Sequence, residues 1–140
     1  MNHRKVMVFG TFDIFHKGHE NFLRQAKRYG DYLIAVIARD RTVEIVKGKS
    51  SRYSEKYRQQ RVRDSGLADE VILGRLGNKC AVIEKYRPDV ICLGYDQASF
   101  VDNLTQFLFS SGLKNVEVKR LRAYKPKIFK SSKLKNAGKN

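Results

Sequence analysis

The sequence predicts an α/β protein: a Rossmann-like three-layer sandwich with a five-stranded, mainly parallel sheet and helices on both faces. Five short β-rich runs alternate with helical segments, and such alternation typically builds a parallel sheet. One run, residues 32–38, is apolar on both faces, as expected for a central parallel strand. At 140 residues, the chain has about the length of one domain.

The first half of the chain provides two strands and two helices. We expect strands at 5–9 and 32–38 and helices at 18–29 and 54–65. Gly10 ends the first apolar run, and Gly30 follows the first helix as a C-terminal glycine does. Ser54 is a favourable N-cap for the second helix, and Gly66 ends it.

The second half continues the alternation. We expect strands at 70–74, at 89–94 and from 116 onward, with helices at 79–86 and 100–111. Pro88 ends the first of these helices and Gly112 the second. No repeat or internal boundary is evident, so we expect a single domain over residues 1–135 and a disordered tail at 136–140.

The charge of the chain is its unusual property. There are 29 Lys and Arg residues against 14 Asp and Glu, a formal net charge of +15. From residue 113 onward there are ten basic residues and only Glu117 as an acid. A basic excess of this kind favours anionic partners, either nucleic acid or phosphorylated small molecules.

Other classes of protein fit the sequence poorly. The longest uninterrupted apolar run, 32–38, is far shorter than the ~18 residues of a membrane span. The N-terminus leads directly into a strand, so no signal peptide is expected. Two cysteines, Cys80 and Cys92, provide no disulfide framework. We therefore expect a cytoplasmic protein with no membrane partner.

Polar residues follow three of the predicted strands. In an open parallel sheet, ligands bind beyond the carboxyl ends of the strands. The segments found there are 10–19, 39–40 and 94–97. The topology therefore gathers their titratable side chains at one edge of the sheet.

His16 and His19 stand at the predicted start of the first helix. They are three residues apart, so both can face one ligand. A helix N-terminus also presents free N–H groups and partial positive charge, which suits a triphosphate. Surface or core histidines are the plain alternative. A zinc pair is disfavoured because the usual spacing and a nearby Cys are missing.

Gly10-Thr11-Phe12-Asp13, followed by His16-x-Gly18-His19, resembles the signature of the cytidylyltransferase-like nucleotidyltransferases. The resemblance extends to about Lys135. Within that family, segments 38–40 and 93–97 are most similar to archaeal-type FAD synthases, which are FMN adenylyltransferases. Glycerol-3-phosphate cytidylyltransferase is the close relative.

The resemblance implies roles for individual residues. His16, His19 and Lys47 would be catalytic and act on the phosphates. Nucleotide binding would involve the β-strand-end motifs and a late serine motif, namely Gly10, Thr11, Phe12, Asp13, His16, Lys17, Gly18, His19, Gly94, Asp96, Tyr124, Ser131 and Ser132. Acceptor binding would involve Asp40, Arg58, Tyr95, Gln97 and Arg122.

Plainer roles are open for several of these residues. Asp40 and the pair Ser131 and Ser132 could be helix caps. Lys47 could belong to a solvated loop, and most of the basic residues around Arg58 are expected to face solvent. Lys17 stands where relatives often have Pro or an aromatic residue, and it could add a phosphate contact.

The implied reaction transfers a nucleoside monophosphate from an NTP to a phosphomonoester and releases pyrophosphate. The implied cofactor is Mg²⁺ or another divalent cation with the NTP, and the implied assembly is a homodimer. ATP with FMN is the expected substrate pair, and CTP with glycerol 3-phosphate is the alternative. A basic nucleic-acid-binding module is a third reading, although the chain shows no recognised nucleic-acid-binding motif.

Overall fold

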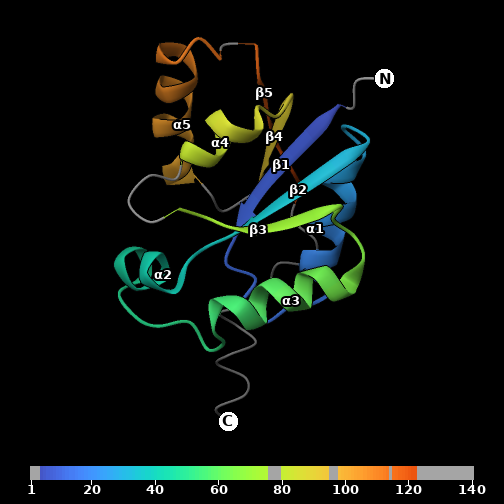
Figure 1. The fold of residues 1–140 in the computed structure, drawn as a ribbon, viewed down its shortest axis with the longest axis vertical. Helices are drawn as coiled ribbons and strands as arrows, with labels where there is room; N and C mark the ends of the chain where they lie inside the picture. The colour runs from blue at the N-terminus through green and yellow to red at the C-terminus, as the bar shows by residue number, and fades with distance from the viewer. Residues whose placement is uncertain (1–3, 76–79, 95–97, 114, 123–140) are drawn as a thin grey trace.

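The computed structural model describes residues 4–75, 80–94, 98–113 and 115–122, and within them it contains one five-stranded sheet (Figure 1). The strands are β1 (Lys5–Gly10), β2 (Tyr32–Ile37), β3 (Glu70–Leu73), β4 (Val90–Leu93) and β5 (Glu117–Arg120). Every pairing is parallel, in the order β3-β2-β1-β4-β5. The predicted Rossmann-like sheet is confirmed.

The helices of the described residues lie between these strands. They are α1 (Lys17–Lys27), α2 (Asp40–Lys47), α3 (Glu55–Ser65), α4 (Ala81–Tyr86) and α5 (Ala98–Ser110). Four were predicted, with bounds that agree to within about two residues. Searched over the described residues alone, the helices include none with the length and apolar character that crossing a membrane requires.

Helix α2 was not predicted. Its sequence contains four β-branched residues, which favour strands over helices, and only Val43 is buried. Its C-cap, Gly48, has φ 75°, the left-handed conformation that glycine adopts without steric cost. Lys47 therefore ends a helix rather than lying in a loop, and its side chain is exposed.

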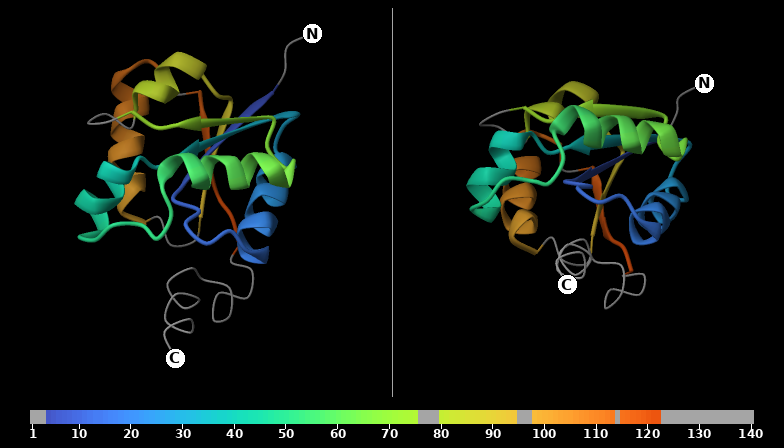
Figure 2. Two further views of the ribbon diagram at one scale, coloured as in Figure 1. Left: turned by 60° about the horizontal axis from the view of Figure 1, so that its bottom comes forward. Right: turned by 90° about the horizontal axis from the view of Figure 1, so that it is seen from below.

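Two apolar clusters form the core, one on each face of the sheet (Figure 2). Helices α1 and α3 pack on one face through Leu23, Ala26 and Val62. Helices α4 and α5 pack on the other, with Ile83 and Leu104 fully buried. Helices α1 and α3 run back from the carboxyl ends of the strands, so both begin at that edge.

Strand order determines where a ligand can enter. The chain moves outward from β1 through β2 to β3, then returns to place β4 on the other side of β1. A crevice at such a reversal, beyond the carboxyl ends of the strands, is the usual binding position in open α/β sheets. Here that position is the loop from β1 to α1.

Candidate active site

The loop from β1 to α1 turns on Gly10 and Phe12. Phe12 has φ 52°, an uncommon left-handed backbone, and its ring is buried. A Cβ on Gly10 would lie 2.6 Å from Cε2 of that ring, so no larger residue fits there. The buried ring holds the loop in this turn, and the loop backbone is thereby fixed above the sheet.

His16 and His19 come together at the start of α1. Their rings stack with centroids 3.9 Å apart. His16 is the N-cap: its Nδ1 accepts a hydrogen bond from the Gly18 backbone N–H at 3.0 Å. His19 Nδ1 accepts from the His16 backbone N–H at 3.4 Å, so the two residues form a reciprocal capping box. The predicted pairing of the two histidines at one helix N-terminus is therefore present.

Burial favours the neutral form of both imidazoles. Burial lowers the pKa of His16 and, more strongly, the pKa of His19 to about 3. The nearby charge of His16 also lowers the His19 pKa, the Ile14 carbonyl opposes this, and the charge of Lys47 contributes in the lowering direction. The charge of Lys47, at the end of α2, therefore acts on the His19 imidazole.

We expect the free energy of unfolding to fall as the pH drops below about 6.5. His19 has a pKa near 6.5 when unfolded and about 3 when folded, so in this window the unfolded chain binds a proton that the folded chain excludes. Between pH 6.5 and 5 this residue should cost about 2 kcal/mol. Urea titrations at both pH values measure this change.

The control for this pH dependence is His19→Gln, which does not titrate. The difference in unfolding free energy between the two pH values should shrink by about the same ~2 kcal/mol in that variant. An unchanged pH dependence would exclude His19 as its source.

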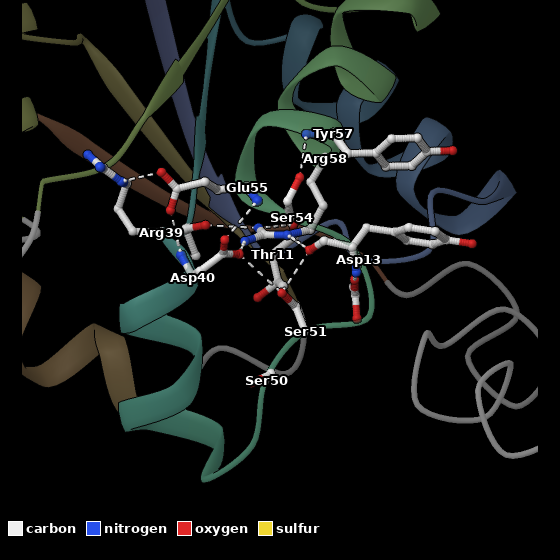
Figure 3. A network of polar contacts seen from close by, with 12 residues as sticks. Thr11, Asp13, Arg39, Asp40, Ser50, Ser51, Ser54, Glu55, Tyr57 and Arg58 are labelled. Carbon is white, nitrogen blue, oxygen red and sulfur yellow. Dashed lines mark hydrogen bonds and ion pairs between the residues drawn. The ribbon is translucent and has the colours of Figure 1, made fainter.

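Arg58 is the centre of a buried polar network at the carboxyl edge of the sheet (Figure 3). Its side chain is 0% exposed. Its guanidinium donates to the carbonyls of Thr11 (2.9 Å), Ala38 (2.8 Å) and Tyr53 (3.0 Å) and to Asp40 Oδ1 (2.7 Å). One side chain thus ties the ends of β1 and β2 to the start of α3.

The acidic residues of the network connect the same segments. Asp13 is buried, and its carboxylate accepts from the backbone N–H groups of Arg52 (2.7 Å) and Tyr53 (2.9 Å). Asp40 accepts from the Glu55 backbone N–H at 3.2 Å. Burial alone would raise the pKa of Asp40, but hydrogen bonds from Arg58 and the Glu55 backbone lower it overall.

The network bears on the roles expected for Arg58 and for Asp40. Arg58 lies among basic residues expected to face solvent, yet it is fully buried, and direct contact with an acceptor would require the network to open. Asp40 does not cap α2; Arg39 is the N-cap, and Asp40 lies inside the helix. Both residues are positioned to shape the site.

The remaining predicted residues are distributed over several places. Lys17 is exposed on the first turn of α1, and the Gly94 carbonyl accepts from Arg120 at 2.7 Å. Arg122 is exposed beside a groove between α1 and β5, and its backbone N–H and carbonyl both bond to the Gln25 side chain. Outside the described residues lie Tyr95, Asp96, Gln97, Tyr124, Ser131 and Ser132, and the tail at 136–140.

Sequence reasoning missed two parts of the site. Glu55 accepts from Arg39 Nε (2.9 Å) and from the Asp40 backbone N–H (2.8 Å), joining α2 to α3. Tyr53 and Tyr57 stack at the start of α3. The signals available were an acidic residue in the first helical turn and two tyrosines spaced i, i+4, which are neighbours on a helix.

Comparison with known proteins agrees with this geometry. The family model described as cytidylyltransferase-like matches residues 7–137. An FAD synthase from Ferroglobus placidus is 42% identical over 121 residues, covering 86% of this chain and 77% of the relative. An FAD synthase from Pyrococcus horikoshii is 38% identical over 134 residues, covering 95% of this chain and 87% of the relative.

Solved structures share the fold. A protein from Thermoplasma volcanium, described as a lipopolysaccharide core biosynthesis protein, superposes with a TM-score of 0.82 at 33% identity, covering 88% of this chain and 99% of that one. A pantoate-beta-alanine ligase from Francisella tularensis has a TM-score of 0.61 at 13% identity, covering 96% of this chain and 65% of that one, which shows the fold alone. With the family model matched from β1 onward and the paired histidines at the predicted place, the chain belongs to the cytidylyltransferase-like family.

Proposed function

We propose that this protein is a nucleotidyltransferase that joins ATP and FMN to form FAD and pyrophosphate. The observation that carries the reaction class is the stacked pair His16 and His19 at the N-terminus of α1, at the topological switch point. The choice of ATP and FMN rests on the relatives named FAD synthase, three of which are 40% or more identical over at least 86% of the chain.

In the proposed reaction, an oxygen of the FMN phosphate attacks the α-phosphorus of ATP. A new P–O bond forms, the α–β bridging bond breaks, and pyrophosphate leaves with the bonding electrons. The acceptor phosphate is already anionic near neutral pH, so the reaction needs no strong base. Positioning and electrostatic stabilisation of the phosphates then carry the catalysis.

The proposed roles follow from the chemistry of the side chains. A neutral imidazole donates from one nitrogen and accepts at the other. Because His16 Nδ1 accepts from Gly18, the ring proton of a neutral His16 is on Nε2, which makes Nε2 the hydrogen-bond donor. We assign His16 and His19 to the phosphates of ATP, with Lys47 adding positive charge. The N–H groups at the start of α1 favour the same anion.

Mg²⁺ enters this proposal as part of the substrate, bound to ATP. Mg²⁺ usually keeps several waters and is held through substrate phosphates with one or two carboxylates. Among the residues that the structure describes, no group of three or more His, Cys, Asp or Glu side chains could hold a metal ion. Asp13, three residues before His16, accepts two backbone hydrogen bonds.

Other parts of the assignment are also proposals. A homodimer, a cytoplasmic location and a single catalytic domain over residues 1–135 are consistent with the family. Arg122, with the groove beside it, is retained as a candidate acceptor contact. We assign Arg58 to positioning the loops of the site, because its guanidinium donates hydrogen bonds to three of their backbone carbonyls.

Pyrophosphate release tests the proposed function directly. The protein is incubated with Mg²⁺ and either FMN or glycerol 3-phosphate, each with ATP or CTP. We expect pyrophosphate and FAD only with FMN and ATP. Product only with glycerol 3-phosphate and CTP would replace this proposal with the alternative, and retention of nucleic acid without any turnover would favour a binding module.

A further inference from the structure

A pair of exposed aromatic rings stands at the edge of the candidate active site. Tyr53 and Tyr57 stack with centroids 4.6 Å apart and ring planes 26° apart. Tyr53 is 37% exposed and Tyr57 is 48% exposed. Two large aromatic side chains thus pack on each other and still present ring surface to solvent, which is the form of a platform for another flat ring.

The backbone of the pair is fixed to the loop that carries the histidines. The Tyr53 N–H donates to Asp13 Oδ1 at 2.9 Å, and its carbonyl accepts from Arg58 Nε at 3.0 Å. The Tyr57 N–H donates to the N-cap oxygen of Ser54 at 3.2 Å. Asp13 is only three residues before His16, so the tyrosines are anchored within a short chain distance of the histidines.

The topology of the sheet places Tyr53 and Tyr57 on the opposite side of β1 from β4, where an acceptor could bind beside a nucleotide. Helices α1 and α3 pack on the same face of the sheet and both begin at its carboxyl edge, so His16 and Tyr57 lie on one face at one edge. The β4 end, where Gly94 lies, is on the opposite side of β1 from α3. A nucleotide lying over β1 and β4 leaves the α3 side open. In Figure 3 the Tyr57 ring projects away from the network, on the side opposite Arg39.

Other exposed aromatic side chains among the described residues lie elsewhere. Tyr29 follows the far end of α1, and Phe109 is near the end of α5. Neither has the anchoring to Asp13 and Arg58 that holds Tyr53. Among the described residues, the pair at the start of α3 is therefore the exposed aromatic surface that the polar network anchors to the loop from β1 to α1.

We propose that Tyr53 and Tyr57 bind the isoalloxazine ring of the acceptor by stacking, and so select a flavin over acceptors without an aromatic ring. This inference rests on the proposed FAD synthase function and adds the acceptor subsite to it. The ribityl chain separates the ring of FMN from its phosphate, so the ring can lie at the start of α3 while the phosphate faces the α-phosphorus. Asp13 and Arg58 position the platform through Tyr53.

Steady-state kinetics of Tyr57→Ala and of Tyr53→Ala/Tyr57→Ala test the subsite. Loss of an aromatic–ring stack should raise KM for FMN roughly 5- to 100-fold, by analogy with stacking on nucleic-acid bases. KM for ATP should change little, and Tyr57→Phe should retain the wild-type KM for FMN. Phe109→Ala is the control, since Phe109 is also an exposed aromatic side chain but lies near the end of α5, on the opposite face of the sheet from α3.

The binding of FMN without ATP separates this inference from the proposed function. Stacking on tyrosine should quench FMN fluorescence, and the quenching should weaken in the double variant but not in Tyr57→Phe or Phe109→Ala. If wild-type protein forms no FAD, quenching that depends on the pair still supports the subsite. An unchanged affinity for FMN in a folded double variant overturns the subsite, whether or not FAD is formed.

Discussion

Replacing His19 or His16 with alanine is expected to lower kcat for FAD formation by about 10²–10³-fold. Each ring is assigned a hydrogen bond that strengthens as charge develops on the phosphates, and loss of one such donor typically costs this much. Pyrophosphate release under saturating ATP and FMN measures the effect. Equal turnover in wild-type and both variants would remove the pair from the mechanism.

His16 needs a control because it is also the N-cap of α1. Alanine at an N-cap costs about 1 kcal/mol of stability, whereas asparagine is a favourable cap. His16→Asn should therefore retain the wild-type Tm but lose the same activity as His16→Ala. If His16→Asn has wild-type turnover, the activity lost in the alanine variant comes from the cap, and His16 has no role in the chemistry.

Arg58→Met is expected to lower the free energy of unfolding by about 3–5 kcal/mol, the typical cost of removing one partner from a buried charged network. The substitution leaves the carbonyls of Thr11, Ala38 and Tyr53 without this donor. Asp40 also loses its ion pair, although its side chain is 43% exposed and water can replace part of that interaction. For a chain of this size, Tm should fall by roughly 10–20 °C.

Arg61→Met is the matched control for Arg58→Met, because Arg61 is on the same helix but exposed. Its unfolding free energy should stay within about 0.5 kcal/mol of wild type, as for most surface substitutions. Equal Tm values for the two variants in a thermal melt would contradict the network role of Arg58.

The positions of the strands and of most helices follow from local patterns. Apolar runs such as 32–38 and glycines such as Gly66 define elements because the signal lies within a few neighbouring residues. Helix α2 is the exception, since its β-branched composition favours a strand. Contacts between Asp40 and residues 11 to 18 positions further along, including Glu55 and Arg58, surround its first turn instead.

The candidate site also has one part that follows from local sequence and another that depends on distant contacts. The motif from Gly10 to His19 is continuous, so the pairing of its histidines at a helix N-terminus was predictable from their spacing, whereas the capping box that they form was not predicted. The burial of Arg58 was not predictable, because its partners Thr11 and Ala38 are 47 and 20 residues away in the sequence. A sequence pattern does not indicate which of several neighbouring basic residues will be buried and bonded to carbonyls so far away in the chain.

By itself, the sequence determined an alternating α/β fold, a pair of histidines at the start of the helix that follows β1, and the family that carries this motif. Only the tertiary structure decided that Arg58 is buried within the polar network and that Tyr53 is anchored to Asp13, in the loop that leads to the histidines. The physical reason is that local propensity and capping act over a few residues, whereas these positions are set by hydrogen bonds that join β1, β2 and α3 across the chain.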